Sequence, residues 1–327
     1  MDRRHQSTIT VESTAAASSR QAALAATVAS VFFGASVVAT RFVVPQTTPV
    51  ILAFLRYAIA CGCVIAVAGR RAFPAMPRRD RIQVALLGVL FFAIFPWSFS
   101  ASLTYLPATH VALVVATNPL VTMALSALRG VERISTRRLA GQLMAFAGLA
   151  IALPALNTDH GMAGGSEEAW KGYLLVSITV LCGSTYNVLS RPLLLRHPSL
   201  AVTSLSMVAG TLALAPLAIA QGLPAHTATI TASGWMAVLF LATFGGAVGF
   251  GLWSFALRHS TPSRVAVFLA INPMTAIALG VLLLDEPFTV RLLLGLVAVT
   301  IGIQLATRGP RPTAVAHAPD APVPHRQ

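Results

Sequence analysis

Charged residues are scarce in this sequence. Asp, Glu, Lys and Arg make up 10% of its 327 residues, whereas hydrophobic residues make up 56% and the mean hydropathy is +0.75. A soluble globular domain carries about 25% charged residues. Because so little charge is available to cover a water-exposed surface, we expect most of the surface to face lipid. The composition excludes an ordinary soluble domain and predicts an integral membrane protein.

Cysteine and buried acid are scarce too, and each absence excludes a class of chemistry. Cys61, Cys63 and Cys182 all lie within apolar stretches, and no Cys/His cluster has the spacing of a zinc site. We therefore expect no disulfide, no metal and no other cofactor. No Asp or Glu lies deep in any apolar stretch, which argues against a carboxylate proton relay at the membrane midplane. The sequence also has no P-loop, so nothing indicates ATP drive.

The basic residues outnumber the acidic ones, 23 against 10, but their placement argues against nucleic-acid binding. Arginines lie in short clusters between apolar runs, where they fix the orientation of a membrane protein. With the N-terminus in the cytoplasm, only Arg41, Lys171 and Arg291 fall in outer segments, and Arg56 lies within a span. We expect a multi-pass protein of the bacterial cytoplasmic (plasma) membrane with both termini cytoplasmic.

Ten apolar stretches approach the roughly 20 residues that a membrane-spanning helix needs. Their approximate ranges are 22–44, 50–69, 82–103, 108–128, 139–156, 170–194, 200–221, 235–257, 264–284 and 292–307. The sequence therefore predicts an all-α membrane protein with ten transmembrane helices. The expected organisation is a disordered cytoplasmic tail (1–20), a first five-helix repeat (21–156), an external linker (157–169), a second five-helix repeat (170–307) and a disordered Pro-rich tail (308–327).

One stretch occurs twice at a constant shift of 154 residues. The first copy begins THVALVVATNP at Thr109 and the second begins SRVAVFLAINP at Ser263. The shift superposes Asn118-Pro119 on Asn272-Pro273, Glu132 on Glu286, Gly141 on Gly295 and Gly148 on Gly302. Each half holds an odd number of predicted spans, so the two copies point in opposite directions. Inverted repeats of this kind are typical of secondary transporters, which bind substrate near the midplane between the repeats.

These blocks resemble the EamA-like family of the drug/metabolite transporter superfamily. The residues that carry the resemblance are Pro262-Ser263-Arg264-Val265-Ala266, Asn272-Pro273, Leu284-Asp285-Glu286-Pro287, Gly295 and Gly302, together with Arg56-Tyr57 and Phe33-Gly34. The resemblance implies two inverted halves of five helices and export of small metabolites or toxic compounds. It also implies a central cavity lined mainly by spans one, three, four, six, eight and nine. The first copy departs from the pattern, with Val131 and Arg133 where the second has Asp285 and Pro287.

Two prolines are the expected bending points. A proline inside a helix removes a backbone hydrogen bond and kinks the helix. Pro119 and Pro273 should therefore bend spans four and nine and free the carbonyls of Val115 and Leu269. The bends serve either as structural kinks or as hinges beside a substrate path.

Polar and aromatic residues within the spans are the candidates for substrate contact. The asparagines of the two Asn-Pro pairs either pack helices together or line a cavity, and the tryptophans lie well inside spans three and eight. Arg56 either braces its helix or faces the cavity, and His110 is either interfacial or a gate residue. The candidate lining residues are Trp97, Asn118, Tyr186, Asn187, Trp253, Asn272, Arg56 and His110.

Two further sets of residues have expected structural roles. We expect Glu132 and Glu286 to pair with a nearby arginine or to cap the next helix. The glycines of spans five and ten give each span one small face. That face is expected to pack within each half or at a homodimer contact.

The sequence as a whole favours a secondary transporter, in particular an exporter of amino-acid-like compounds or amphipathic toxins. The expected partners are a small-molecule substrate and the lipid bilayer, and no nucleic acid. An intramembrane enzyme is disfavoured because H-E-x-x-H and G-x-S-x-G motifs are both missing. A facilitated uptake permease or a channel for small metabolites is the alternative.

Overall fold

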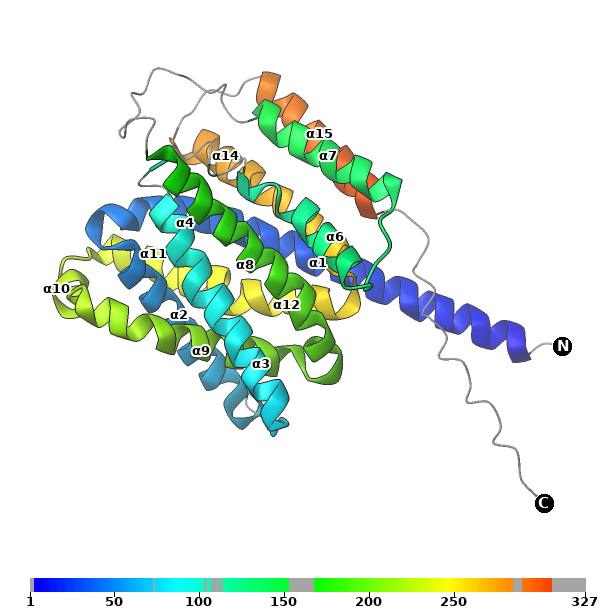
Figure 1. The fold of residues 1–327 in the computed structure, drawn as a ribbon, viewed down its shortest axis with the longest axis horizontal. Helices are drawn as coiled ribbons and strands as arrows, with labels where there is room; N and C mark the ends of the chain where they lie inside the picture. The colour runs from blue at the N-terminus through cyan, green and yellow to red at the C-terminus, as the bar shows by residue number, and fades with distance from the viewer. Residues whose placement is uncertain are drawn as a thin grey trace.

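The computed structural model describes residues 3–72, 74–102, 105–106, 111, 114–152, 168–284 and 290–307, and over these residues it contains helices and no strand (Figure 1). In chain order the α-helices are α1 (Arg3–Val43), α2 (Pro49–Ala68), α3 (Arg78–Val89), α4 (Phe95–Ser102), α6 (Asn118–Leu128), α7 (Thr136–Ala152), α8 (Ala169–Arg196), α9 (Ser199–Ala220), α10 (Leu223–Ala228), α11 (Ala232–Ala242), α12 (Gly249–His259), α13 (Pro262–Ala266), α14 (Ile271–Leu284) and α15 (Val290–Thr307).

Six helical stretches are long and apolar enough to cross a membrane. They are Ser19–Thr40, Pro49–Ala68, Arg78–Ser102, Ala169–Arg196, Ser199–Ala220 and Ala232–His259. They match predicted spans one, two, three, six, seven and eight, and they confirm an all-helical membrane protein. The other four predicted spans form the duplicated blocks, where the described helices are shorter or interrupted, as in Asn118–Leu128 and Leu293–Thr307.

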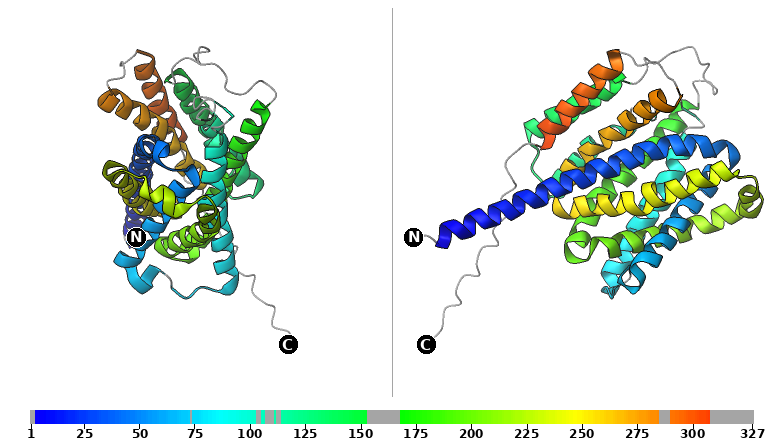
Figure 2. Two further views of the ribbon diagram at one scale, coloured as in Figure 1. Left: turned by 90° about the vertical axis from the view of Figure 1, so that its left-hand side faces the viewer. Right: turned by 180° about the vertical axis from the view of Figure 1, so that it is seen from behind.

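The N-terminal segment differs from the disordered tail that we expected for residues 1–20. Helix α1 begins at Arg3 and runs without a break to Val43, and its first turns project beyond the bundle (Figures 1 and 2). The sequence between residues 3 and 33 has no Gly and no Pro, so nothing in it interrupts a helix.

Local signals place the ends of α2 where the sequence changes character. Thr48 caps the start, because its hydroxyl accepts a hydrogen bond from the Ile51 amide at 3.3 Å. Pro49 occupies the first helical position, where its missing N–H costs nothing. Gly69 ends the helix with a φ of +51°, a conformation that glycine adopts readily.

The third span of each half contains a π-helical segment. In the first half η3 (Leu90–Ile94) joins α3 to α4, and in the second η4 (Thr243–Val248) joins α11 to α12. Each segment precedes a Trp-Ser-Phe triplet, at Trp97 and at Trp253. Single π turns inside α-helices occur frequently at functional sites.

The two Asn-Pro pairs lie at the start of helices rather than in the middle of continuous ones. Asn118 and Pro119 begin α6 directly after a turn at residues 116–117. Asn272 and Pro273 lie in the first turn of α14, after the 3₁₀ segment η5 (Val267–Ala270). A proline is tolerated in the first turn of a helix. Each span is therefore interrupted just before its proline, whereas we had expected a kink at it.

Helices α7 and α15, which correspond under the 154-residue shift, pack side by side along one edge of the bundle (Figures 1 and 2). A Cβ atom added to Gly141 would lie 2.7 Å from the Gly302 carbonyl oxygen, and one added to Gly148 would lie 2.9 Å from that of Gly295. Residue numbers thus rise along one helix as they fall along the other, so the pair is antiparallel. The small faces join the two halves of one chain, which corrects our expectation of packing within each half or at a homodimer contact.

The α7–α15 contact predicts opposite effects for two glycine substitutions. The Cβ of Gly302→Ala would lie 2.5 Å from the backbone nitrogen of Ala145, whereas that of Gly62→Ala meets nothing within 4 Å. Alanine favours a helix over glycine by up to about 1 kcal/mol, but overpacking costs about 1–3 kcal/mol. We expect Gly302→Ala to lower the thermal unfolding midpoint in detergent and Gly62→Ala to preserve or raise it. Equal midpoints for the two variants would contradict the close approach of α7 and α15.

Candidate functional site

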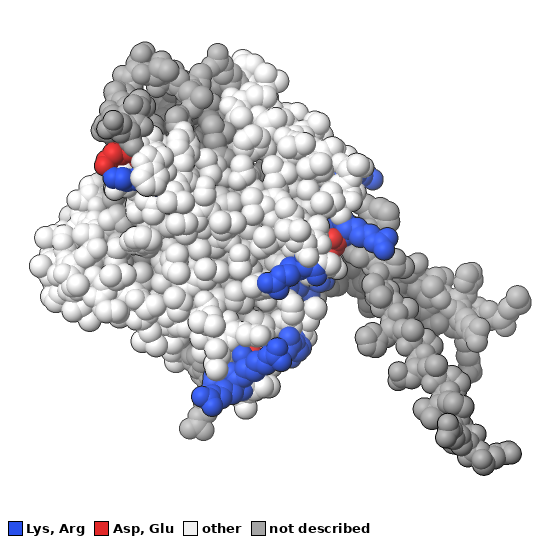
Figure 3. Space-filling view, in the orientation of Figure 1, with Lys and Arg blue, Asp and Glu red and all other residues white. Residues whose placement is uncertain are grey.

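Charged side chains gather at one end of the molecule. The described arginines lie mainly at the start of α3, in the α6–α7 connection and at the ends of α8 and α12, and they form basic patches along one side of Figure 3. This is the end that the sequence predicts to be cytoplasmic, and we call it the basic end.

An aromatic cluster fills the centre of the bundle. It joins side chains from α1, α2, η3, α8 and α12, and its members are Phe33, Tyr57, Phe91, Phe92, Tyr186, Phe250 and Trp253. The rings of Phe91 and Tyr186 are stacked with their centroids 4.3 Å apart. The cluster therefore contains helices of both halves.

Three predicted lining residues come together in this cluster. Tyr186, Asn187 and Trp253 are all at least 98% buried, and the indole Nε1 of Trp253 donates to Asn187 Oδ1 at 3.0 Å. The bond orients a polar amide inside an aromatic wall, where an unpaired amide would be costly. In this structure these residues pack against one another and do not line an open cavity.

Each of the two Asn-Pro pairs packs against the first helix of the opposite half. Asn118 Nδ2 donates to the Val180 carbonyl of α8 at 3.4 Å, and the Ser184 hydroxyl donates to the main-chain carbonyl of Asn118 at 3.2 Å. A Cβ on Gly183 would lie 2.6 Å from Asn118 Nδ2. These contacts give Asn118 a role in packing.

Asn272 occupies the corresponding place in the second half. A Cβ on Gly34 of α1 would lie 2.4 Å from the main-chain oxygen of Asn272, so only glycine permits this approach. Unlike that of Asn118, the side-chain Oδ1 of Asn272 is buried without a hydrogen-bond partner among the described residues. The Leu269 carbonyl, which we expected to be free, accepts from the Ile271 amide.

Arg56 joins the two halves through the π-helical segment of the second half. Its Nη2 donates to the Gly245 carbonyl at 2.6 Å, and its guanidinium carbon lies 5.4 Å from the centroid of the Tyr57 ring. Its Nε is buried without a partner among the described residues. Arg56 therefore braces η4 and carries a positive charge that no described carboxylate contacts.

Glu132 connects the halves at the basic end. Its carboxylate contacts Arg138 Nη1 at 2.6 Å and accepts from the Ser263 amide at 3.2 Å and from the Ser263 hydroxyl. Gln142 Nε2 adds a bond to the Ser263 carbonyl at 3.4 Å. The expected pairing of Glu132 with a nearby arginine is confirmed. The helix that Glu132 caps is not the next one in the chain but α13 of the opposite half.

A second carboxylate at the basic end was missed by the sequence analysis. Asp80, buried at the start of α3, contacts Arg196 Nη1 at 3.1 Å and His197 Nε2 at 2.7 Å. Arg258 also donates to the His197 carbonyl at 3.3 Å. In the sequence, Asp80 is an isolated acid between arginines in the segment RRDR, and this pattern could have identified it as a candidate for an ion pair.

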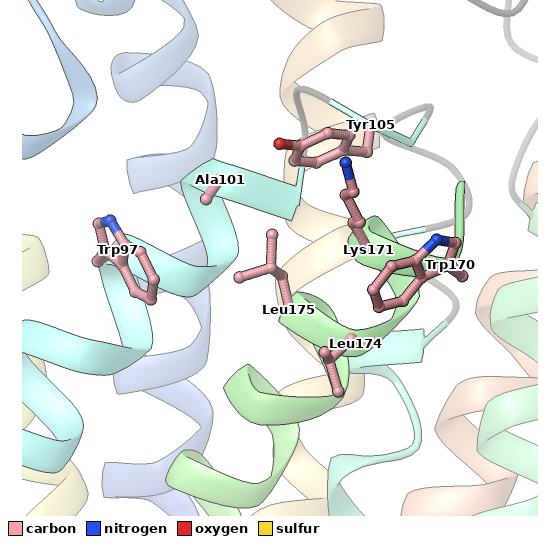
Figure 4. A pocket seen from close by; sticks show the side chains of 7 residues that line it. All are labelled: Trp97, Ala101, Tyr105, Trp170, Lys171, Leu174 and Leu175. Carbon is pink, nitrogen blue, oxygen red and sulfur yellow. The ribbon is translucent and has the colours of Figure 1, made fainter. Parts of the chain in front are cut away.

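Trp97 lies away from the aromatic centre, which corrects its predicted place in a central cavity. Its side chain is 44% exposed and borders an open groove of about 440 Å³ between α4 and the start of α8 (Figure 4). Its repeat counterpart Trp253 is 2% exposed. The other predicted residues His110 and Glu286 lie outside the described residues.

Comparison with known proteins identifies the family. The model of the EamA-like transporter family matches the chain twice, over residues 20–153 and 170–308. An uncharacterized transporter of Archaeoglobus fulgidus is 27% identical over 280 residues, which cover 85% of this chain and 95% of the relative.

Two further relatives have names that state what they export. A "probable amino-acid metabolite efflux pump" of Salmonella typhimurium is 25% identical over 85% of this chain and 92% of the relative. A "probable terminal-alkyne amino-acid exporter" of Streptantibioticus cattleyicolor is 26% identical over 79% and 83%, respectively.

The fold is also similar to that of a solved structure. One crystal structure superposes with a TM-score of 0.73 at 22% identity, covering 88% of this chain and 98% of that one. With the family model matching both halves, the chain belongs to the EamA-like transporter family.

Proposed function

We propose that this protein is a secondary transporter that exports small organic molecules, amino-acid-like or amphipathic, across the cytoplasmic membrane by alternating access. The observation that carries the proposal is the pair of interrupted helices at corresponding positions of the two halves, one before Asn118-Pro119 and one before Asn272-Pro273. Interrupted helices in matching positions of inverted repeats mark substrate sites in secondary transporters. The antiparallel packing of α7 and α15 supports a ten-helix arrangement of two inverted five-helix halves.

The chemistry of the interior supports an amino-acid-like substrate. Arg56 offers a positive charge for a carboxylate, and the neighbouring aromatic cluster offers a wall for an apolar side chain. Asn272 adds a buried carbonyl oxygen that can accept from an ammonium group. The names of the two exporter relatives point in the same direction.

Alternating access requires the contacts between the halves at one end to break. At the basic end the halves are joined by the buried carboxylates of Glu132 and Asp80. At the opposite end Gln46 bonds to the Thr231 amide and hydroxyl, but these groups are exposed. Because buried charged contacts resist opening more than solvated ones, we assign the structure to a state closed toward the cytoplasm.

Untargeted analysis of the growth medium tests the export proposal. We would compare cells without the protein and cells with wild type, Asn272→Leu or Leu282→Ala at matched membrane abundance; Leu282 is 74% exposed on the same helix, α14, and serves as the control. We expect a metabolite to accumulate several-fold outside with wild type and Leu282→Ala but not with Asn272→Leu. Depletion of a metabolite from the medium would instead indicate uptake, and unchanged media across several carbon and nitrogen sources would contradict export.

The contact at Glu132 predicts a large stability effect. Glu132→Gln leaves the partly buried Arg138 without its counter-charge, and loss of one partner of a buried ion pair costs about 3–5 kcal/mol. We expect a lower unfolding midpoint, and a combined effect with Ser263→Ala that is smaller than the sum of the single effects.

A matched control separates this effect from a general loss of charge. Glu168→Gln removes an exposed carboxylate and should leave the midpoint unchanged. Strict additivity of Glu132→Gln and Ser263→Ala would contradict a direct contact between the halves.

A further inference from the structure

The open groove beside Trp97 is not explained by the proposed transport path. It lies between α4 of the first half and the start of α8 of the second (Figure 4). The start of α8 is at the end of the molecule opposite the basic end (Figures 1 and 3). Its volume of about 440 Å³ falls in the range of small-molecule sites. Its lining residues are Trp97, Ala101, Tyr105, Trp170, Lys171, Leu174 and Leu175.

The groove changes from polar to apolar along its length. Lys171 Nζ lies at its rim, 2.5 Å from Glu168 Oε1 and 6.0 Å from the centroid of the Tyr105 ring. Trp97 lies four residues before Ala101 on α4, about 6 Å further along the helix. An amphipathic molecule therefore fits with its polar group at the rim and its apolar part against Trp97 and Leu174.

The walls of the groove are exposed on the surface of the bundle. Trp170 is 60% exposed, Leu174 54% and Trp97 44%. In a membrane protein, exposed apolar side chains of this kind contact acyl chains, and Trp, Tyr and Lys together are typical of the headgroup level. The groove is thus accessible to a lipid from the leaflet at this end.

We propose that the groove binds a phospholipid with a zwitterionic headgroup that carries a primary ammonium, namely an ethanolamine phospholipid. Lys171 contacts the lipid phosphate, Glu168 accepts from the lipid ammonium, and one acyl chain lies along Trp97 and Leu174. The rim pair has no net charge, so it complements a headgroup of one negative and one positive group. An anionic lipid would place its charge beside Glu168, and a choline headgroup has no N–H to donate.

The Lys171–Glu168 pair can open to receive such a headgroup. Its side chains are 40% and 56% exposed, and exposed ion pairs of this kind contribute little stability. When the headgroup binds, Lys171 exchanges Glu168 for the lipid phosphate and Glu168 exchanges Lys171 for the lipid ammonium. Each side chain therefore keeps one partner of opposite charge. The inference goes beyond the proposed function, because the site requires neither a transported substrate nor a direction of transport.

Lipid retention by the purified full-length protein tests the proposal. The protein would be extracted from bilayers that hold equal amounts of phospholipids with ethanolamine, choline or glycerol headgroups and the same acyl chains. The lipids that the protein retains after detergent exchange would be counted by mass spectrometry. We expect wild type to retain the ethanolamine lipid at least tenfold over the other two. Lys171→Gln should abolish this preference, whereas Trp97→Ala, which removes a contact with the acyl chain, should lower the retention of all three lipids.

Arg79→Gln provides the matched control, because Arg79 is an exposed cation at the basic end. It should keep the wild-type preference, and an unchanged unfolding midpoint for Lys171→Gln would show that the variant is folded. Equal retention of the three lipids, a preference for the anionic glycerol lipid, or a preference that survives Lys171→Gln would each overturn the proposal. If the growth-medium comparison shows no export but the lipid preference is observed, the transport proposal is contradicted and the lipid-site proposal is supported.

Discussion

The arrangement of the bundle depends on two close contacts between the halves. In each contact, an Asn-Pro helix start of one half lies against a glycine in the first helix of the other: Asn118 against Gly183, and Asn272 against Gly34. Any side chain at either glycine would meet its neighbour within 2.6 Å. Because such contacts fix helix positions to a fraction of an ångström, they hold the interrupted helices at the interface of the halves, where a transporter needs them.

The lipid environment explains why so many interior polar groups contact the main chain. In a bilayer, every backbone group must find a partner within the protein. Arg56 bonds to the carbonyl of Gly245 in a π-helical segment, and Ser184 bonds to the carbonyl of Asn118 at a helix start. Irregular backbone, which the proposed transport path would use, is thus stabilised by the same side chains that we propose for substrate contact. A structural role for these residues does not compete with a functional one.

Much of the fold could be predicted because the bilayer imposes simple rules on sequence. Long apolar runs and clustered arginines identified a helical membrane protein, and the constant 154-residue shift identified the duplication. The environments of single side chains were harder to predict. Trp97 and Trp253 occupy related triplets, yet one is exposed in a groove and the other is buried, because helical periodicity alone does not say which neighbour covers a face.

The contacts between the halves could not be predicted from the sequence for a similar reason. The pairing of Gly141 with Gly302, and of Glu132 with Ser263, joins residues more than 120 positions apart. A repeated small face shows that a helix packs closely, but it does not name the partner. The Asp80 contacts with Arg196 and His197 depend on how the ends of α3 and α8 meet, which only the assembled bundle shows.

Separation of the two halves at the basic end is tested most directly by the thiol reactivity of Ser190→Cys. Ser190 is fully buried on α8, one turn from Asn187 toward the basic end, and cysteine is nearly isosteric with serine. The background would carry Ala in place of Cys61, Cys63 and Cys182. Separation predicts slow labelling that Glu132→Gln accelerates several-fold while Glu168→Gln does not. If the introduced cysteine stays unlabelled both in the folded Ser190→Cys protein and in its folded Glu132→Gln variant, separation at this end would be contradicted.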